Sequence, residues 1–375
     1  MGGTTTAPRP LRLGIIGTGL AVEKLHWPAL RQLTDRYTIV AFANHARPKA
    51  EAFAAYSGAS LDAFHRDYRD LLRRDDVDAV LVSLPIALNE PVTRACLEAG
   101  KHVICEKPAG GNREQAADFL ALAEQFPDRR VLVAENWFYR DDLRLARSLL
   151  DDGAIGRLHL LSWRVASHLI PREGTFSSTP WRWQPQYRGG PHLDAGVHHV
   201  AQIRLLCGDV QRVHGETQYA NATHGGPSDL AMTLRFAGEA IGSYAAVYAD
   251  IPLPPDENAM RLYGDQAVMT LVNRDVRVHR PDGTVEAWTA AGGDGGYYNE
   301  FLDFYDAVVH DAPLVGTIAQ SVQNGLVIFA GLDSAEGLRV LEVERVVPGG
   351  VPLWRPRGAS GLFDGLPVKV ERVDE

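Results

Sequence analysis

The chain has 375 residues, of which 45% are hydrophobic and 23% charged, a composition typical of a soluble globular protein with about two domains. Its formal net charge of -9 excludes the basic surface that nonspecific nucleic-acid binding needs. The three widely spaced cysteines, Cys96, Cys105 and Cys207, indicate reduced thiols and a cytoplasmic location. Because the sequence has neither a secretory signal pattern nor an apolar stretch of membrane-spanning length, we expect no membrane partner.

Apolar runs alternate with helix-compatible stretches through the first third of the chain. The runs predicted as strands are residues 11–17, 37–44, 77–85, 102–108 and 129–136. The helices predicted between them are residues 21–32, 47–58, 90–100 and 113–126. This alternation predicts a parallel sheet covered by helices on both faces, since the strands are almost continuously apolar.

After Asn136 the pattern changes to short alternating runs separated by turn residues. Strands are expected at residues 158–168, 210–220, 228–235, 240–249, 259–263, 267–272 and 276–280. Helices are expected at residues 141–151, 193–206, 298–310 and 318–337. We therefore predict an α/β domain over residues 10–135 and an α+β domain with a large open, mainly antiparallel sheet over residues 136–375.

Gly17, Thr18 and Gly19 follow the first predicted strand and precede a predicted helix, which is the context of a dinucleotide-binding loop. The first glycine permits a tight turn, and the second lets the backbone approach a pyrophosphate at the helix N-terminus. The third position of this fingerprint is Val22, where glycine or alanine is usual. The alternative is therefore a plain strand-to-helix turn.

The end of the second predicted strand bears on the choice of cofactor. An NAD-binding domain usually carries Asp or Glu there, which accepts hydrogen bonds from the ribose hydroxyls. This chain has Asn44 and His45, followed by Arg47, so no carboxylate repels a 2′-phosphate and a guanidinium is close by. The sequence favours NADP(H) over NAD(H). The alternative is that Arg47 and Lys49 are solvated residues at the start of a surface helix.

The segment AGKHVICEKP ends the fourth predicted strand with Glu106, Lys107 and Pro108. Ligands of a doubly wound sheet bind beyond the carboxyl ends of its strands, so we expect Lys107 to face the cofactor. The alternative is an ordinary surface lysine at the end of a strand.

The segment GGPHLDAGVHHV contains three histidines and one aspartate. On one continuous helix, Asp194 and His198 lie one turn apart, so the carboxylate is expected to orient the imidazole as a general acid/base. A metal site would use His192, Asp194, His198 and His199, but adjacent helical residues point about 100° apart. A zinc site and a helix with ordinary surface histidines stay open as alternatives.

The glycine loop, the EKP segment and the DAGVH segment occur in the order and spacing of the Gfo/Idh/MocA oxidoreductase family, which the chain resembles over nearly its whole length. The resemblance implies an N-terminal Rossmann domain that binds NAD(P), and a C-terminal sheet that shapes the substrate site and mediates assembly into a homodimer or homotetramer. It also implies that Lys107, Asp194 and His198 form the catalytic group. Because a single carboxylate–imidazole pair suits proton transfer better than metal binding, we expect no metal.

The resemblance extends to further contacts with the cofactor or substrate. Leu84, Pro85 and Asn89 match a loop that passes the nicotinamide ribose, although the family often has His in place of Asn89. Asn136 and Arg182 fall where relatives often touch cofactor or substrate. Together with the motifs above, the residues expected at the cofactor are Gly17, Thr18, Gly19, Leu20, Ala21, Asn44, His45, Arg47, Leu84, Pro85, Asn89, Glu106, Lys107, Asn136 and Arg182.

These residues predict hydride transfer between a nicotinamide dinucleotide and a carbinol or ketone of a sugar, cyclitol or sugar derivative. His198 would exchange the proton and Lys107 would donate a hydrogen bond to the reacting oxygen. Aromatic and polar residues that precede the histidine segment suit a polyhydroxylated ring. They are Trp163, Arg164, His168, Arg172, Trp181, Arg182, Trp183 and Tyr187. The alternatives are a non-catalytic dinucleotide-binding regulator on the same fold and a metal-dependent enzyme.

Overall fold

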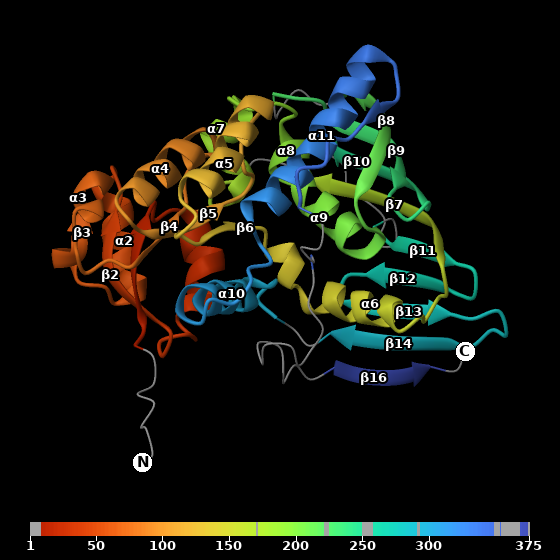
Figure 1. Cartoon of the computed structure of the whole chain (residues 1–375), viewed down its shortest axis with the longest axis horizontal. Coiled ribbons are helices and arrows are strands. Elements are labelled where there is room, and N and C mark those ends of the chain that lie inside the picture. The colour runs from red at the N-terminus through yellow and green to blue at the C-terminus, as the bar shows by residue number, and fades with distance from the viewer. Residues whose placement is uncertain are drawn as a thin grey trace.

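The computed structural model describes residues 9–169, 172–220, 225–249, 258–290, 293–348, 353 and 368–373. Two sheets organise the chain, one formed by the N-terminal third and one by the remainder (Figure 1). No helix of the described residues is long and apolar enough to cross a membrane.

The first sheet has six parallel strands in the order β3-β2-β1-β4-β5-β6. This is the order of a doubly wound dinucleotide-binding sheet, whose direction of winding reverses between β1 and β4. Its strands are β1 Leu11–Ile16, β2 Tyr37–Ala43, β3 Phe64–His65, β4 Ala79–Val82, β5 His102–Glu106 and β6 Val131–Ala134. The helical segments between them are a π-helix, Val22–His26, which leads into α1 Trp27–Leu30, then α2 Arg47–Ser57, a 3₁₀ turn Leu61–Ala63, α3 Tyr68–Leu72, α4 Ile86–Glu98 and α5 Arg113–Gln125.

Local sequence signals explain where these elements begin and end. All four residues of β4 are buried, as the apolar run predicts for a strand covered on both faces. Helix α5 begins at Asn112, whose side chain accepts a hydrogen bond from the backbone N–H of Gln115, and α2 ends at Gly58 in the left-handed conformation.

The second sheet has ten strands in the order β15-β8-β9-β10-β7-β11-β12-β13-β14-β16. Only β7 and β10 run parallel, so the sheet is mainly antiparallel. Its strands are β7 Leu158–His168, β8 Val210–Gln218, β9 Asp229–Phe236, β10 Ile241–Ala249, β11 Met260–Gly264, β12 Val268–Val272, β13 Asp275–His279, β14 Val285–Ala290, β15 Leu341–Glu342 and β16 Val368–Val373. Its helical segments are a 3₁₀ turn Asn136–Tyr139, α6 Asp141–Asp151, a 3₁₀ turn Phe176–Ser178, α7 Pro180–Trp183, α8 Pro191–Asp194, α9 Gly196–Cys207, α10 Tyr297–Val309 and α11 Ile318–Gly337.

Helices cover one face of the second sheet and leave the other face open (Figure 1). In β9, Leu230, Met232 and Leu234 are buried toward α11, whereas Ala231 and Thr233 on the opposite face are exposed. Since most residues of α9 and α11 are buried, these two helices form the centre of the second core.

Helix α10 returns from the second half of the chain to pack on the first sheet, where Figure 1 shows it beneath the N-terminal strands. Phe301 and Phe304 join the core of Leu13 and Phe42, and the Tyr37 hydroxyl donates a hydrogen bond to the Phe301 carbonyl at 2.5 Å. The C-terminal half therefore contributes to the core of the N-terminal half, and the division of the chain at residues 135 and 136 stays a prediction.

The predicted fold class, a parallel α/β sheet followed by a mainly antiparallel one, is confirmed. The single helix predicted over residues 193–206 is wrong, because Ala195 separates α8 from α9. The strand predicted over residues 129–136 ends at Ala134, so Asn136 lies in a 3₁₀ turn. The short elements β3, β14, β15, β16 and α3 were not predicted, because few of their residues carry a clear period.

Candidate active site

A cleft of about 1330 Å³ opens at the carboxyl ends of β1, β2, β4 and β5 and extends to α8 and α9. Ile16, Ala43, Ser83 and Glu106 line it from the strand ends, and Asp194 and His198 line it from the second half of the chain. Pockets for single small molecules usually measure about 300–1,000 Å³. This cleft therefore has room for a dinucleotide together with a second molecule.

The glycine loop fits the floor of a pyrophosphate site. Gly17 has a φ of 90°, and a Cβ there would lie 2.1 Å from the Ser83 carbonyl oxygen, so the turn requires glycine. A Cβ on Gly19 would meet nothing within 4 Å, so the loop borders open space in the cleft at this position. The Thr18 hydroxyl accepts a hydrogen bond from Asn44 Nδ2 at 3.0 Å and donates one to the Lys49 carbonyl at 3.2 Å. These bonds fix the loop against β2 and α2.

Most of the residues predicted at the cofactor line the cleft. They are Gly17, Thr18, Gly19, Leu20, Ala21, Asn44, His45, Leu84, Pro85, Glu106, Lys107 and Arg182.

Three other predicted residues, Arg47, Asn89 and Asn136, are not part of this lining. Arg47 begins α2 with a side chain that is 69% exposed, and its Nε donates a hydrogen bond to Glu51 at 2.8 Å. Asn89 is buried in α4 and donates from Nδ2 to the Glu106 carbonyl at 2.9 Å. Asn136 donates from Nδ2 to the Gly295 carbonyl at 2.7 Å. Asn89 and Asn136 thus support the walls of the cleft from behind.

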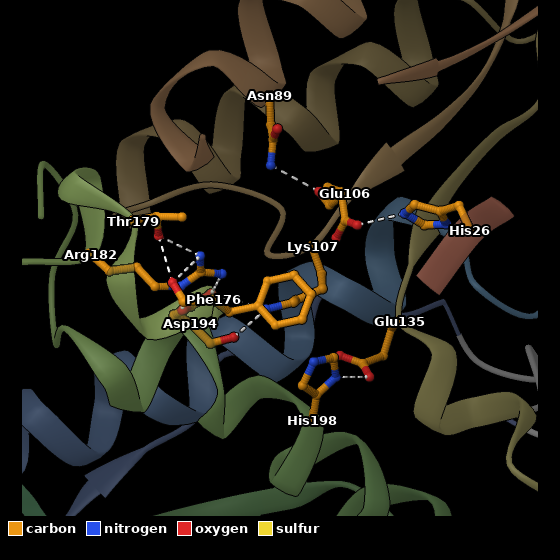
Figure 2. A network of polar contacts seen from close by, with 10 residues as sticks. All are labelled: His26, Asn89, Glu106, Lys107, Glu135, Phe176, Thr179, Arg182, Asp194 and His198. Atoms are coloured by element: carbon orange, nitrogen blue, oxygen red, sulfur yellow. Dashed lines mark hydrogen bonds and ion pairs between the residues drawn. The ribbon is translucent and has the colours of Figure 1, made fainter. Parts of the chain in front are cut away.

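Lys107, Asp194 and Arg182 form a buried charged group, seen at the centre left of Figure 2. Lys107 Nζ lies 3.0 Å from Asp194 Oδ1, and Arg182 Nε lies 2.5 Å from Asp194 Oδ2. Arg182 also donates from Nη1 to the Thr179 hydroxyl at 2.8 Å and lies 4.0 Å from the ring centroid of Trp181. Burial alone would raise the pKa of Asp194, but the charges of Lys107 and Arg182 outweigh it and hold that pKa well below its usual range.

The break between α8 and α9 has a direct cause at this site. Lys107 Nζ donates to the backbone carbonyl of Asp194 at 2.5 Å, whereas the N–H of His198 bonds to the Ala195 carbonyl instead. The lysine therefore takes the carbonyl that would continue an α-helix. The prediction that Asp194 orients His198 from one turn away is wrong, because the Asp194 carboxylate faces Lys107 and Arg182.

Glu135 is the partner of His198, and the sequence analysis did not single it out. His198 Nδ1 lies 2.5 Å from Glu135 Oε1, and the Glu135 side chain is only 1% exposed (Figure 2). The Trp137 ring stacks on the His198 ring at a centroid distance of 5.4 Å and an interplanar angle of 15°. The position of Glu135 immediately after the carboxyl end of β6 could have indicated a site residue, because ligands of such a sheet bind beyond the carboxyl ends of its strands.

A second carboxylate–imidazole pair lies on the other side of Lys107. His26 Nε2 is 2.7 Å from Glu106 Oε1, and His26 is completely buried. His26 is part of the π-helix, a geometry often found at functional sites. His26 was not predicted in the site, because its place on the first helix after the glycine loop had indicated a packing or capping residue.

Glu300 is a third buried carboxyl in this region, and its oxygens have no hydrogen-bond partner among the described residues. Burial raises the pKa of Glu300 well above its usual range, and the nearby charges of Glu106 and Glu135 add to that shift. The raised pKa favours the neutral, protonated form of Glu300.

The other two histidines of GGPHLDAGVHHV point into the core. His192 packs edge-on against Tyr248 at 5.0 Å, and His199 Nδ1 lies 2.8 Å from the Tyr244 hydroxyl. Burial lowers the pKa of His192 to about 4 and that of His199 to about 3, so both rings are neutral. No group of three metal-ligating side chains occurs among the described residues, so the metal-dependent alternative gains no support.

The predicted aromatic and polar lining is only partly at the cleft. Trp181, Arg182 and Tyr187 line it, as does Phe176, which the sequence analysis did not name. Trp163 instead belongs to the core of the second sheet, with its indole N–H bonded to the Asn258 carbonyl. Arg164 lies on the exposed face of β7, because it alternates with the buried residues of that strand.

The cleft has a glycine loop at one end and buried lysine, aspartate and histidine side chains at the other. This arrangement defines a dinucleotide-dependent oxidoreductase. Residues 11–134 match the family model of oxidoreductases with an NAD-binding Rossmann fold named for Gfo, Idh and MocA, and residues 143–270 match a C-terminal domain of the same family. The chain belongs to the Gfo/Idh/MocA oxidoreductase family.

Similar proteins agree with this assignment. A dTDP-3,4-didehydro-2,6-dideoxy-alpha-D-glucose 3-reductase of Streptomyces violaceoruber is 32% identical over 76% of this chain and 82% of its own length. An oxidoreductase structure from Thermotoga maritima is 28% identical, with a TM-score of 0.83 over 90% of this chain and 100% of that one. The WlbA dehydrogenase from Chromobacterium violaceum, solved with NADH and UDP-GlcNAcA, shares the fold at 18% identity, with a TM-score of 0.78 over 90% of this chain and 97% of that one. Alignments to the first three curated relatives span 66%, 82% and 55% of their lengths.

Proposed function

We propose that the chain transfers a hydride between NADP(H) and a carbinol or ketone of a sugar, cyclitol or sugar derivative. The observation that carries this proposal is that the Gly17–Gly19 loop lines the same cleft as Lys107, Asp194 and His198. In this proposal the loop residues and Leu84 and Pro85 hold the dinucleotide, and the bound nicotinamide accepts or supplies the hydride.

The proposed proton chemistry uses the two groups beside the reacting oxygen. In the oxidative direction, His198 accepts the proton of the carbinol hydroxyl, and in the reductive direction it returns a proton to the forming alcohol. The ammonium of Lys107 donates a hydrogen bond to the same oxygen and stabilises its negative charge. The Lys107 contact to Asp194 fixes the ammonium at the cleft, so in this proposal Asp194 positions Lys107.

Cations near the end of β2 support the NADP(H) preference. Asn44 and His45, not Asp or Glu, occupy the two positions after β2, and Lys49 and Arg66 line the cleft beyond them, together with Asp67 and Asp70. A 2′-phosphate bound there would gain charge-assisted hydrogen bonds from these side chains. All three side chains are exposed, but Lys49 and Arg66 line the cleft and Arg47 does not, so Lys49 and Arg66 are better placed for this contact.

The substrate proposal has support from the opposite end of the cleft. Phe176, Trp181 and Tyr187 supply apolar faces, and Arg182 lies among them. Such a lining suits the CH faces and hydroxyls of a sugar ring. The printed name of the Streptomyces violaceoruber relative, a reductase of a dTDP-linked keto-sugar, is consistent with this class.

A fluorescence titration of the purified chain with NADPH and with NADH tests the cofactor part of the proposal. We expect saturable binding of both and tighter binding of NADPH. The Gly19→Ala variant tests the site itself and should bind both dinucleotides more weakly. Its methyl group enters open space without disturbing the fold but blocks close approach of a pyrophosphate. Failure of the wild type to bind either dinucleotide would overturn the proposal.

The exposed face of the second sheet supports a further proposal, that the chain assembles into a homodimer or homotetramer. Ala231 and Val247 lie on this face, and Ile241 there is 43% exposed. Light scattering coupled to gel filtration measures the assembly directly.

We also propose a cytoplasmic location, since all three cysteines are free.

A further inference from the structure

His198 is held by the N-terminal half of the chain although it belongs to the C-terminal half. Its Nδ1 atom faces Glu135, which follows β6 of the first sheet, whereas His198 itself lies in the first turn of α9. The backbone N–H of Trp137 donates to the same Glu135 oxygen at 3.3 Å. Because Nδ1 is engaged, Nε2 is the ring nitrogen left for the cleft that His198 lines.

Two aromatic contacts restrict the ring further. The Trp137 indole stacks on the His198 imidazole, and the Arg140 guanidinium carbon lies 4.4 Å from the Trp137 ring centroid. Glu135 itself does not line the cleft and its carboxylate is almost completely buried. Among the described residues that line the cleft, His198 is the one to which Glu135 hydrogen-bonds, so we expect Glu135 to act on a reaction there through His198.

We infer that Glu135 is the positioning residue of His198: its carboxylate holds the proton on Nδ1, so that Nε2 faces the reacting oxygen as the proton acceptor. This inference rests on the proposed function for its chemical role. It assigns to a residue of the first domain the task that the sequence pattern had suggested for Asp194.

The chemical consequence is a defined tautomer and a stabilised cation. In the oxidative direction, the O–H bond of the carbinol breaks as an Nε2–H bond forms, and the hydride leaves the carbinol carbon for the nicotinamide. The proton on Nδ1 stays on the ring, and the Glu135 carboxylate stabilises the resulting imidazolium. Without that carboxylate, the neutral ring has no fixed tautomer and the imidazolium loses its counter-charge.

Other charged and titratable groups surround the pair. The groups that act on His198, Glu135 or their neighbours are Glu106 at the end of β5 and Lys107 after it, Asp194 from α8, His199 from α9, Arg140 after the 3₁₀ turn, and Asp294, Tyr297, Glu300 and Asp303 on or beside α10. Of these, Glu300 is the matched control, because it is a fully buried glutamic acid close to Glu135 that has no bond to an imidazole.

The test is nitrogen NMR of the intact protein labelled with ¹⁵N-histidine, with the His198 signals identified by their loss in His198→Gln. We expect Nδ1–H in the wild type. In Glu135→Leu, which removes the acceptor, we expect the population to move toward Nε2–H. In Glu135→Gln, whose amide can accept a hydrogen bond from Nδ1–H or donate one to a bare Nδ1, we expect a mixture of the two neutral tautomers. Glu300→Gln replaces a neutral acid by a neutral amide and should match the wild type.

A kinetic measurement gives an independent readout on any substrate that the wild type turns over. Glu135→Gln should lower kcat at least about tenfold, within the range of general acid/base effects, and leave the KM for the dinucleotide unchanged. The wild-type tautomer in both Glu135 variants would overturn the inference, and the near-isosteric Glu135→Gln keeps the test valid if Glu135→Leu does not fold. A wild-type chain that binds no dinucleotide would overturn the proposed function instead, while the NMR result would still decide whether Glu135 fixes the tautomer.

Discussion

At the scale of single residues, the site is a set of largely buried charged side chains that are held in pairs. Asp194 lies between Lys107 and Arg182, and Glu135 lies against His198. Burying such groups is costly unless they are paired, so each pair fixes the geometry of its members. Arg47 and Lys49 are both exposed, but Arg47 pairs with Glu51 away from the cleft, whereas Lys49 lines the cleft.

The residue-scale prediction concerns cofactor choice. Lys49→Ala should weaken NADPH binding about tenfold more than NADH binding, because it removes one charge-assisted hydrogen bond to the 2′-phosphate. Arg47→Ala is the matched control and should change both affinities little. Fluorescence titrations of the two variants measure this. A selective loss of NADPH affinity in Arg47→Ala alone would show that the initial expectation from the sequence was the better one.

At the scale of elements, the sequence predicted the strands and helices that carry strong periods, together with the glycine loop and Lys107 at strand ends. It could not predict the break at Ala195, because that break depends on a lysine 87 residues earlier bonding to the Asp194 carbonyl. The pairing of Glu135 with His198 was equally hidden, since a contact over 63 residues leaves no local pattern. Local period fixes which face of a helix is buried, but tertiary contacts decide which polar groups meet.

The element-scale prediction concerns the pH dependence of stability around α8. His192 is buried as the neutral form with a pKa of about 4, below its ordinary value of 6.5, whereas the unfolded chain takes up a proton below 6.5. The free energy of unfolding should therefore fall between pH 7 and pH 5, by about 2 kcal/mol for this group.

Urea unfolding of wild type and His192→Phe at the two pH values measures this difference. The variant should lose about 2 kcal/mol less than the wild type on acidification, and the exposed His214→Phe should behave as the wild type. An equal loss in His192→Phe would mean that His192 is not buried in its neutral form.

At the scale of the whole molecule, the two halves of the chain share a core and an active site. Helix α10 packs Phe301 and Phe304 under the first sheet, and Glu135 and His198 join the halves at the cleft. The structure thus combines an α/β half and an α+β half, as the order of predicted elements indicated, but the connection through α10 was not foreseen. That connection involves residues about 290 positions apart, such as Leu13 and Phe301, and no sequence period reports it.

The whole-molecule prediction is that disrupting α10 destabilises both halves together. Phe301→Ala removes a fully buried ring and should lower the free energy of unfolding by about 3–5 kcal/mol. Circular dichroism and tryptophan fluorescence should report the same shifted transition. The partly exposed Ile241→Ala should change stability far less. Separate transitions for the two probes in the wild type would contradict a shared core.

The most direct test of the central claim is hydride transfer itself, followed by the absorbance of the reduced nicotinamide. The chain with NADP⁺ or NADPH is mixed with a panel of sugars, inositols, keto-sugars and nucleotide-linked sugars, and Lys107→Ala and His198→Ala are compared with the wild type. We predict turnover of at least one member by the wild type, a loss of at least about 100-fold in kcat in each variant, and dinucleotide binding that both variants retain. Dinucleotide binding without turnover of any member would favour the regulator, and undiminished turnover in both variants would contradict the assignment of Lys107 and His198.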